Sequence, residues 1–478
     1  MSVKNALGWT TLAQLVASVL QFASSLVLAR VLSPEEVGVF AVGVATSGIL
    51  AVIQQLGLPG LIIREEVLSR NFEATVFSIN LIFSLIVAIA ICVAGSLAEM
   101  IFDDRRVEHV MYVLALGPIV FSLSFLPSAH LERDGNFKML AFAAVAGAAA
   151  TALFTIALLY MGMRVMSLAY AQLIGYIVTS VLLIWFGRRY SKIIFGLRQW
   201  RQVASFSFRV VLISGSYNIS QRISEMSLAK LAGLPSLGLY NRASSINGLI
   251  ASNVYSVIGK VYLVHFAQSH REGNSLSPHY LETASALVVI LWPAYLGIAL
   301  LSPYVLTVIY GPQWSPAAVA LSLLCVASAI SVSVSLSAEL FLATGNVNTQ
   351  ARLEMKRACI STVLFTAGAL ISFEVAAATR IIDAVLAVWL YRPHVKAMAG
   401  VTSRDFSSIY KVGGFLTVLA LLPSAAALLF FPESLRHLPG LISSILAGVL
   451  LWVGGLQLVS HPLLNPLKKL IASRGFSY

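Results

Sequence analysis

The chain has 478 residues, of which 58% are hydrophobic and 11% are charged, and its mean hydropathy is +0.86. Soluble globular proteins carry about 25% charged residues, so this composition excludes a soluble enzyme, including one held by a membrane tether. The net charge of +12 does not indicate nucleic-acid binding here, because the cytoplasmic loops of membrane proteins collect Lys and Arg.

Apolar runs between Pro, Gly and charged residues predict an all-α polytopic membrane protein. About 20 apolar residues in a helix suffice to cross a bilayer. Fourteen such runs lie at 6–29, 37–57, 74–98, 108–128, 139–161, 165–187, 206–229, 238–263, 281–302, 317–342, 357–373, 375–391, 412–431 and 441–461.

The distribution of basic residues predicts the orientation of these helices. With fourteen crossings, most Lys and Arg residues fall in connectors on the side of the N-terminus, and the clearest are 188–201, 352–357 and 392–411. The positive-inside rule therefore places both termini in the cytoplasm.

The sequence repeats itself weakly at an offset of 200 residues. Segment 28–40 (LARVLSPEEVGVF) is similar to segment 228–240 (LAKLAGLPSLGLY). In each copy the preceding helix carries a polar stripe at spacings of three and four, which is one helical face. The stripes are Gln14, Ser18, Gln21 and Ser25 in one copy, and Ser214, Asn218, Gln221 and Glu225 in the other.

This repeat predicts three regions. They are an N-lobe of six helices over 1–190, a C-lobe of six over 191–395, and two additional helices with a cytoplasmic tail over 396–478. Six is even, so both lobes enter the membrane from the same side and form a parallel repeat, with the substrate site between them near the midplane. Two interpretations of the polar stripes stay open: they line that cavity, or they mediate helix packing.

Charged residues inside the predicted spans are costly, at about 2.5–3.5 kcal/mol each, and usually face water or a partner. The cations are Arg209, Arg222, Arg242, Lys260 and Arg380. Arg209 and Lys260 could instead snorkel to headgroups. Arg222 could pair with Glu225, and Arg380 with Asp383, because each pair is three residues apart. Arginine forks suit phosphate oxygens. The predicted substrate-binding residues are Arg30, Arg222, Arg242, Lys260, Gln14, Gln21, Asn218 and Gln221.

Transport against a gradient requires a titratable or cation-binding group, and the coupling candidates are Glu225 and Asp383. The sequence does not choose among H⁺, Na⁺ and the membrane potential. It contains no Walker A motif, no H-E-x-x-H and no metal-spaced Cys/His cluster. We therefore expect no catalytic residue, no metal and no cofactor.

Three segments carry a resemblance to a known family. Segment 28–38, segment 237–243 (LGLYNRA) and segment 311–318 (GPQWSPAA) are similar to motifs of bacterial O-antigen and exopolysaccharide flippases, which belong to the multidrug/oligosaccharidyl-lipid/polysaccharide exporter superfamily. Segment 264–267 (VHFA) departs from the Phe-Pro pair that often ends the eighth helix in that family.

The resemblance implies a non-enzymatic flippase of the bacterial inner membrane. Such proteins move undecaprenyl-pyrophosphate-linked oligosaccharides to the periplasmic leaflet by alternating access, for lipopolysaccharide, exopolysaccharide or capsule synthesis, and a polysaccharide polymerase is a candidate partner. The alternatives are a cation-coupled drug exporter of the same fold, a membrane polysaccharide polymerase and a peptidoglycan-precursor flippase. A polymerase would be expected to carry a large external loop, and none is predicted.

Overall fold

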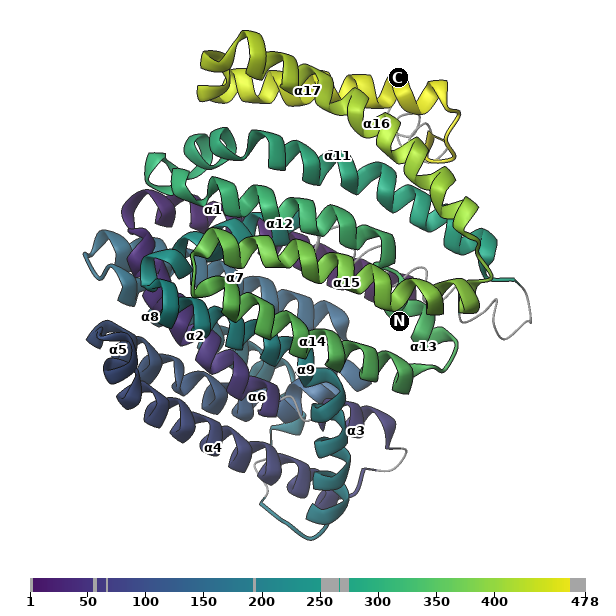
Figure 1. The fold of residues 1–478 in the computed structure, drawn as a ribbon. Coiled ribbons are helices and arrows are strands. Elements are labelled where there is room, and N and C mark those ends of the chain that lie inside the picture. The colour runs from purple at the N-terminus through teal and green to yellow at the C-terminus, as the bar shows by residue number, and fades with distance from the viewer. Residues whose placement is uncertain are drawn as a thin grey trace, which may run out of the picture. The chain divides into compact units, whose positions relative to one another are not determined.

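The computed structural model describes residues 3–54, 58–65, 68–191, 195–250, 266 and 275–464 (Figure 1). Throughout these ranges the chain forms helices and no strand. Nine described helical segments are long and apolar enough to cross a membrane. Further helices lie over the other five predicted spans, at α2, α9, 234–250, α14 and α15. The all-α membrane fold is confirmed, and this arrangement is compatible with fourteen spans.

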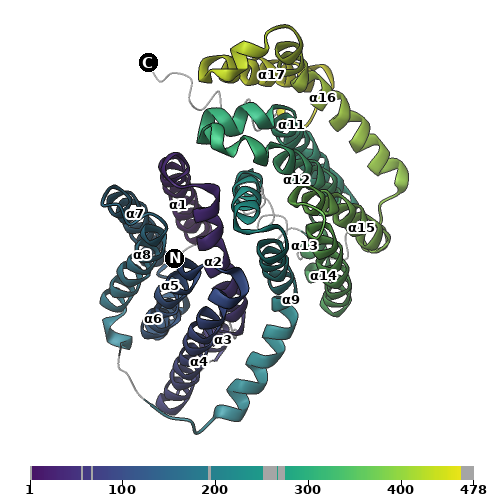
Figure 2. The ribbon, with the colours of Figure 1, turned by 60° about the vertical axis from the view of Figure 1, so that its left-hand side comes forward.

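The first of two compact units comprises Met1–Asn241 with Ala369–Phe373. Its helices, shown from a second side in Figure 2, are α1 (Val3–Val31), α2 (Pro34–Gln54), α3 (Leu58–Arg64), α4 (Arg70–Phe102), α5 (Arg105–Leu114), α6 (Leu116–Arg133), α7 (Phe137–Tyr160), α8 (Val165–Phe186), η1 (Arg188–Tyr190), α9 (Trp200–Ala232) and the start of helix 234–250. Within it α7 packs on α1 and α8, and α2 packs on α9.

The second unit comprises Arg242–Gly368 with Glu374–Tyr478. Its helices are α11 (Ser277–Tyr310), η2 (Pro312–Ala317), α12 (Ala318–Ser331), η3 (Val332–Val334), α13 (Ser337–Ala343), α14 (Val347–Ala369), α15 (Phe373–Ala399), α16 (Ser403–Phe430), η4 (Pro432–Arg436) and α17 (Leu438–Leu458). Here α11 packs on α12 and α16, and α16 packs on α17.

Local chemistry explains several helix boundaries. Ser69 caps α4 by accepting a hydrogen bond from the Phe72 amide, and Thr402 and Asp405 form a capping box at the start of α16. Two helices begin well before the predicted spans, α14 at Val347 rather than near 357 and α16 at Ser403 rather than near 412, so basic residues expected in connectors lie on helices. Hydropathy misses these first turns because polar residues fill them.

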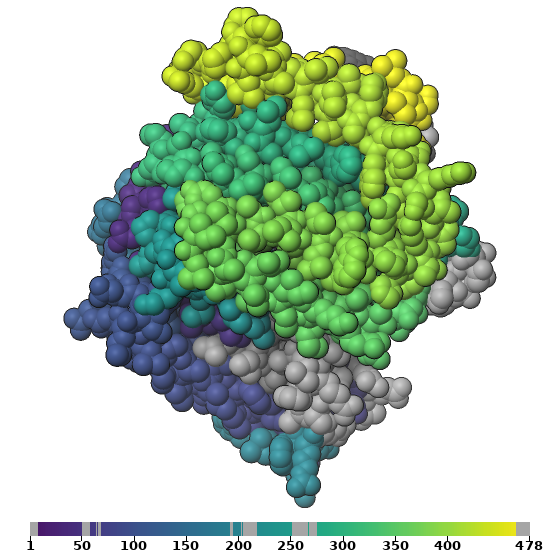
Figure 3. All heavy atoms as spheres, viewed as in Figure 1, coloured from purple at the N-terminus to yellow at the C-terminus, as the bar shows by residue number. Residues whose placement is uncertain are grey.

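Large apolar side chains on the outward faces suit a lipid environment. On α15, Ile382, Val385 and Trp389 are exposed, and Figure 3 shows the face of the molecule on which this helix lies. Exposed apolar surface on this scale is unusual for a soluble monomer and is expected where lipid replaces water.

The two similar segments of the sequence contact each other in the first unit. A Cβ atom on Gly38 would lie 1.9 Å from the carbonyl oxygen of Leu234, and one on Gly238 would lie 1.8 Å from that of Pro34. Each glycine thus faces the residue four positions before the other glycine, so the contact is reciprocal, as in an approximate two-fold arrangement. The lobe boundaries at 190 and 395 stay a prediction.

Candidate functional site

The polar stripe on α1 is partly exposed. Gln14 and Gln21 are exposed, as is Arg30 near the end of the helix, whereas Ser18 and Ser25 are half-buried. Unpaired amide side chains are disfavoured against lipid tails, so exposure on a spanning helix favours a water-filled cavity for this face. Their role in substrate binding stays a prediction.

The stripe on α9 contains an ion pair. The Arg222 Nη1 atom donates to the Glu225 carboxylate at 2.9 Å, one helical turn away. The side chain of Arg222 is 33% exposed, and that of Glu225 is 19% exposed. The pairing anticipated from the spacing is therefore present. Asn218 is exposed and Gln221 is half-buried on the same helix.

Arg222 also lies against α2. A Cβ atom on Gly48 would be 2.8 Å from the Arg222 Nε atom and 3.3 Å from its Cδ atom. Farther along the same pair of helices, Thr46 contacts the Met226 sulfur at 4.0 Å. The sequence placed Arg222 in a span but did not indicate which helix it meets.

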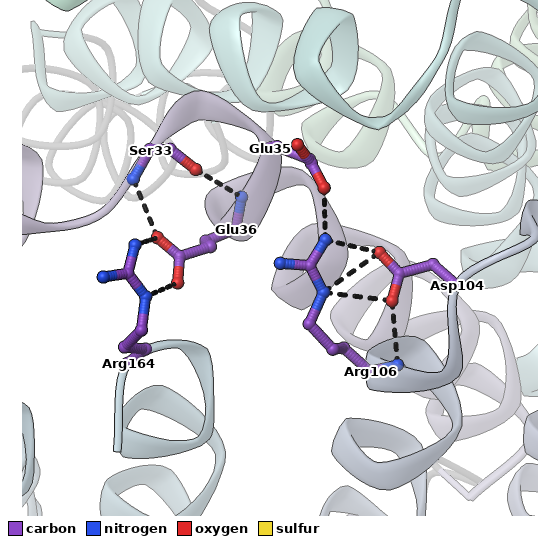
Figure 4. Close-up of polar contacts among 6 residues, drawn as sticks. All are labelled: Ser33, Glu35, Glu36, Asp104, Arg106 and Arg164. Atoms are coloured by element: carbon purple, nitrogen blue, oxygen red, sulfur yellow. Dashed lines mark hydrogen bonds and ion pairs between the residues drawn. The ribbon is translucent and has the colours of Figure 1, made fainter. Parts of the chain in front are cut away.

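A charged cluster at the junction of α1 and α2 was not predicted (Figure 4). Glu36, on the first turn of α2, accepts two hydrogen bonds from the Arg164 guanidinium, at 2.5 and 2.8 Å, and one from the Ser33 amide at 3.0 Å. Beside it, Arg106 bridges Glu35 and Asp104. These contacts join the α1–α2 junction to the starts of α5 and α8. The sequence feature that could have indicated this cluster is the pair of acidic residues Glu35-Glu36 in segment 28–38.

The cluster holds Arg164 in an unusual backbone conformation. Its φ is 45° and its ψ is −125°, in a region that favours glycine. Such strain persists where surrounding contacts hold the residue in place. The paired hydrogen bonds to Glu36, whose side chain is 3% exposed, are such a contact.

We expect Glu36→Gln to lower the melting temperature of the purified protein at pH 7. Burial alone would raise the pKa of Glu36, but the hydrogen bonds from Arg164 and Ser33 outweigh it and lower the pKa below its ordinary value of 4.5. A lowered folded-state pKa adds stability above the ordinary pKa, and that stability is lost as the pH falls through the folded-state pKa. Since the Arg164 side chain is 62% exposed, the contribution is about 1 kcal/mol.

Thermal unfolding of wild type and Glu36→Gln from pH 7 down to pH 3.5 tests this expectation. The gap between the two melting temperatures should narrow as the pH drops below about 4.5. A gap that is constant across this range would show that the carboxylate charge is not the source of the stability.

Arg242 lies inside the second unit. Its guanidinium carbon is 4.8 Å from the ring centroids of both Tyr310 and Trp314, and the residue is 7% exposed. This contact joins segment 237–243 to segment 311–318. With two aromatic rings beside its guanidinium, Arg242 gains cation–π stabilisation and reaches little open space. Its predicted role in binding substrate is not tested by this placement.

A charged network connects α14 and α15. Arg357 donates two hydrogen bonds to Asp383, at 3.0 and 2.9 Å, and Glu354 accepts one from Tyr391. The coupling candidate Asp383 is thus the partner of an arginine on a neighbouring helix. The sequence spacing suggested Arg380 instead.

Arg380 has other partners. Its guanidinium stacks on Phe365 at 4.3 Å and donates to the Ser361 hydroxyl at 3.0 Å. The three-residue spacing to Asp383 therefore does not produce the contact it suggested.

Two predicted residues cannot be placed. Lys260 lies outside the described residues, and so does the side chain of Arg209. In the part of the chain that the structure describes, no group of three or more His, Cys, Asp or Glu side chains could hold a metal ion.

Comparison with known proteins identifies the relatives of this chain. The profile of the family described as "Polysaccharide biosynthesis protein" matches residues 27–319, which is more than half of the chain. The succinoglycan biosynthesis transport protein ExoT of Rhizobium meliloti (strain 1021) is 23% identical over 336 residues, covering 69% of this chain and 67% of that protein. The lipopolysaccharide biosynthesis protein WzxC of Escherichia coli (strain K12) is 21% identical over 324 residues, covering 66% of this chain and 65% of that protein.

Solved structures share the fold. The lipid II flippase MurJ in an inward closed conformation aligns with a TM-score of 0.79 at 14% identity, covering 95% of this chain and 99% of MurJ. An inward-facing MATE family transporter aligns with a TM-score of 0.64 at 16% identity, covering 81% of this chain and 96% of that transporter. The family match confirms the resemblance to polysaccharide biosynthesis proteins, and the solved structures show that the fold is shared.

Proposed function

The chain belongs to the polysaccharide biosynthesis protein family, and from that membership we propose that it is a flippase for lipid-linked oligosaccharides. Its cargo would be an oligosaccharide repeat unit on undecaprenyl pyrophosphate, moved from the cytoplasmic to the periplasmic leaflet of the bacterial inner membrane. The names of ExoT, a succinoglycan biosynthesis transport protein, and of WzxC, a lipopolysaccharide biosynthesis protein, support this proposal. The chain itself would form or break no covalent bond.

The partly open arginine on α9 is the observation that carries the proposal. Gly38 and Gly48 are ten residues apart on α2, which is about 15 Å of helix, or roughly half the hydrocarbon thickness. Since the predicted span on α2 begins at residue 37, Arg222, which lies against Gly48, would be near the middle of the bilayer. Arg222 is paired with Glu225 there, yet a third of its side chain stays exposed, so an anionic pyrophosphate headgroup could still reach its guanidinium fork.

The pair Arg222–Glu225 also provides a route to coupling. An anionic headgroup that engages Arg222 would compete with Glu225, and the released carboxylate could take up H⁺ or Na⁺. Alternating access would then be driven by that ion or by the membrane potential. Asp383, held by two hydrogen bonds from Arg357, is less free to exchange its partner.

We expect Arg222→Ala to reduce glycan export at least about tenfold, since a charge-assisted contact to the headgroup contributes about 1.5–3 kcal/mol. The assay uses a strain deleted for this gene, complemented with each variant, and quantifies surface polysaccharide and lipid-linked repeat units. Arg198→Ala, on an exposed loop, is the matched control and should export normally. Arg242→Ala should also impair export, with a lower melting temperature because two ring contacts are lost.

The deletion strain distinguishes this function from its alternatives. Intact single repeat units that accumulate on undecaprenyl pyrophosphate at the cytoplasmic leaflet would support a flippase. Unpolymerised repeats at the periplasmic leaflet would indicate a polymerase. An unchanged pool of lipid-linked glycan would contradict both and favour export of a small molecule.

A further inference from the structure

We propose that Gly48 is a positioning residue for Arg222, holding its guanidinium where it meets the headgroup of the cargo. The identity of the headgroup rests on the proposed function. The position of the guanidinium rests on the geometry of α2 and α9. Both helices belong to the first compact unit.

The guanidinium is held from two sides. On α9, Glu225 accepts a hydrogen bond from Nη1 at 2.9 Å. On α2, the missing side chain of Gly48 leaves the space that Nε, Cδ and Cζ occupy, at 2.8, 3.3 and 3.5 Å from where a Cβ would be. Because Gly48 accommodates the Nε and Cδ atoms, the arginine fork loses little conformational freedom when an anion takes the place of Glu225.

The atoms that a Cβ at position 48 would meet belong to the flexible side chain of Arg222, so a substitution there should move that side chain rather than a helix. At Gly38 the obstructing atom is the backbone carbonyl of Leu234, which cannot yield without moving a helix. At Gly48 the obstructing atoms lie at the far end of an arginine, which can rotate away. Alanine at position 48 should therefore leave the fold intact and displace only the guanidinium.

The internal repeat supplies the matched control. Gly248 is the equivalent of Gly48 at the offset of 200, and a Cβ placed there meets no atom within 4 Å among the described residues. The equivalents of Arg222 and Glu225 are Phe22 and Ser25, so the charged pair occurs in only one copy. Both glycines are followed by helical residues, so alanine changes intrinsic helix propensity similarly at both.

The test compares Gly48→Ala, Gly248→Ala, Arg222→Ala and the double variant Gly48→Ala/Arg222→Ala. Surface polysaccharide is measured in the complemented deletion strain, and melting temperature in purified protein. We expect Gly48→Ala to lose export about tenfold or more, as for a binding group misplaced by about 1 Å, while Gly248→Ala exports normally. The double variant should export no less than Arg222→Ala alone, because Gly48 acts only through that arginine.

Melting temperatures test the contact between Gly48 and Arg222 independently of glycan export. Any loss of stability in Gly48→Ala relative to Gly248→Ala should disappear in the Arg222→Ala background. If Arg222→Ala reduces export but Gly48→Ala does not, or if the two losses multiply in the double variant, the positioning role is overturned and the proposed function stands. If Arg222→Ala itself exports normally, the proposed contact between Arg222 and the cargo is refuted, and so is the positioning role of Gly48.

Discussion

Gly38→Ala should destabilise this protein by about 1–3 kcal/mol or more, because its Cβ would lie 1.9 Å from the Leu234 carbonyl oxygen. Real carbon–oxygen contacts are well above 3 Å, so the clash is relieved only if α2 and helix 234–250 move apart. That movement would also open the packing of α2 on α9, which includes the contact between Gly48 and Arg222.

Gly238, the reciprocal position on helix 234–250, gives a second and independent expectation of lost stability. Gly238→Ala would place a Cβ 1.8 Å from the Pro34 carbonyl oxygen, so both variants should lower the melting temperature to a similar extent. Gly414→Ala on α16 is the control, because a Cβ there meets no atom within 4 Å in the described part of the chain. Equal melting temperatures for Gly38→Ala, Gly238→Ala and Gly414→Ala would refute the close crossing.

Asp383→Ala should destabilise the protein by about 2–4 kcal/mol through the loss of the partner of Arg357. Removing one member of a buried ion pair typically costs about 3–5 kcal/mol, and the partial exposure of this pair reduces that figure. Glu354 lies 4.0 Å from Arg357 and replaces only part of the lost interaction. The measurement is the melting temperature of the purified variant beside its export activity.

A double replacement of Arg357 and Asp383 distinguishes a structural role of this pair from a role in coupling. Arg357→Met with Asp383→Leu removes both charges and fills similar volume, which commonly restores or raises stability. Recovered stability with normal export would make the pair structural and leave Glu225 as the remaining coupling candidate. Recovered stability with lost export would instead assign Asp383 to coupling.

Much of the fold could be predicted because its determinants are local. A helix in lipid satisfies its own backbone hydrogen bonds, so long apolar runs specify spanning helices without reference to the rest of the chain. The pair Arg222–Glu225 was anticipated for the same reason, since residues three apart on one helix are neighbours. The start of α14 was missed because its first turns are polar although helical.

Contacts between distant residues depended on the tertiary structure. Arg357 meets Asp383 across 26 residues and Arg164 meets Glu36 across 128, and sequence spacing carries no information on such pairs. Arg380 shows the converse, because its neighbour at three residues is not its partner. The offset of 200 predicted that segments 28–40 and 228–240 are equivalent, but not that Gly38 and Gly238 face each other.

The sequence by itself thus determined that this protein is a helical membrane protein, with polar stripes on two helices and a family resemblance in three short segments. The tertiary structure decided which charges are paired, how much of Arg222 stays exposed and which glycines make room for a neighbour. The physical reason is range: hydrophobic periodicity and backbone hydrogen bonding act within one helix. Side-chain pairing and close approach of backbones depend on which helices pack together.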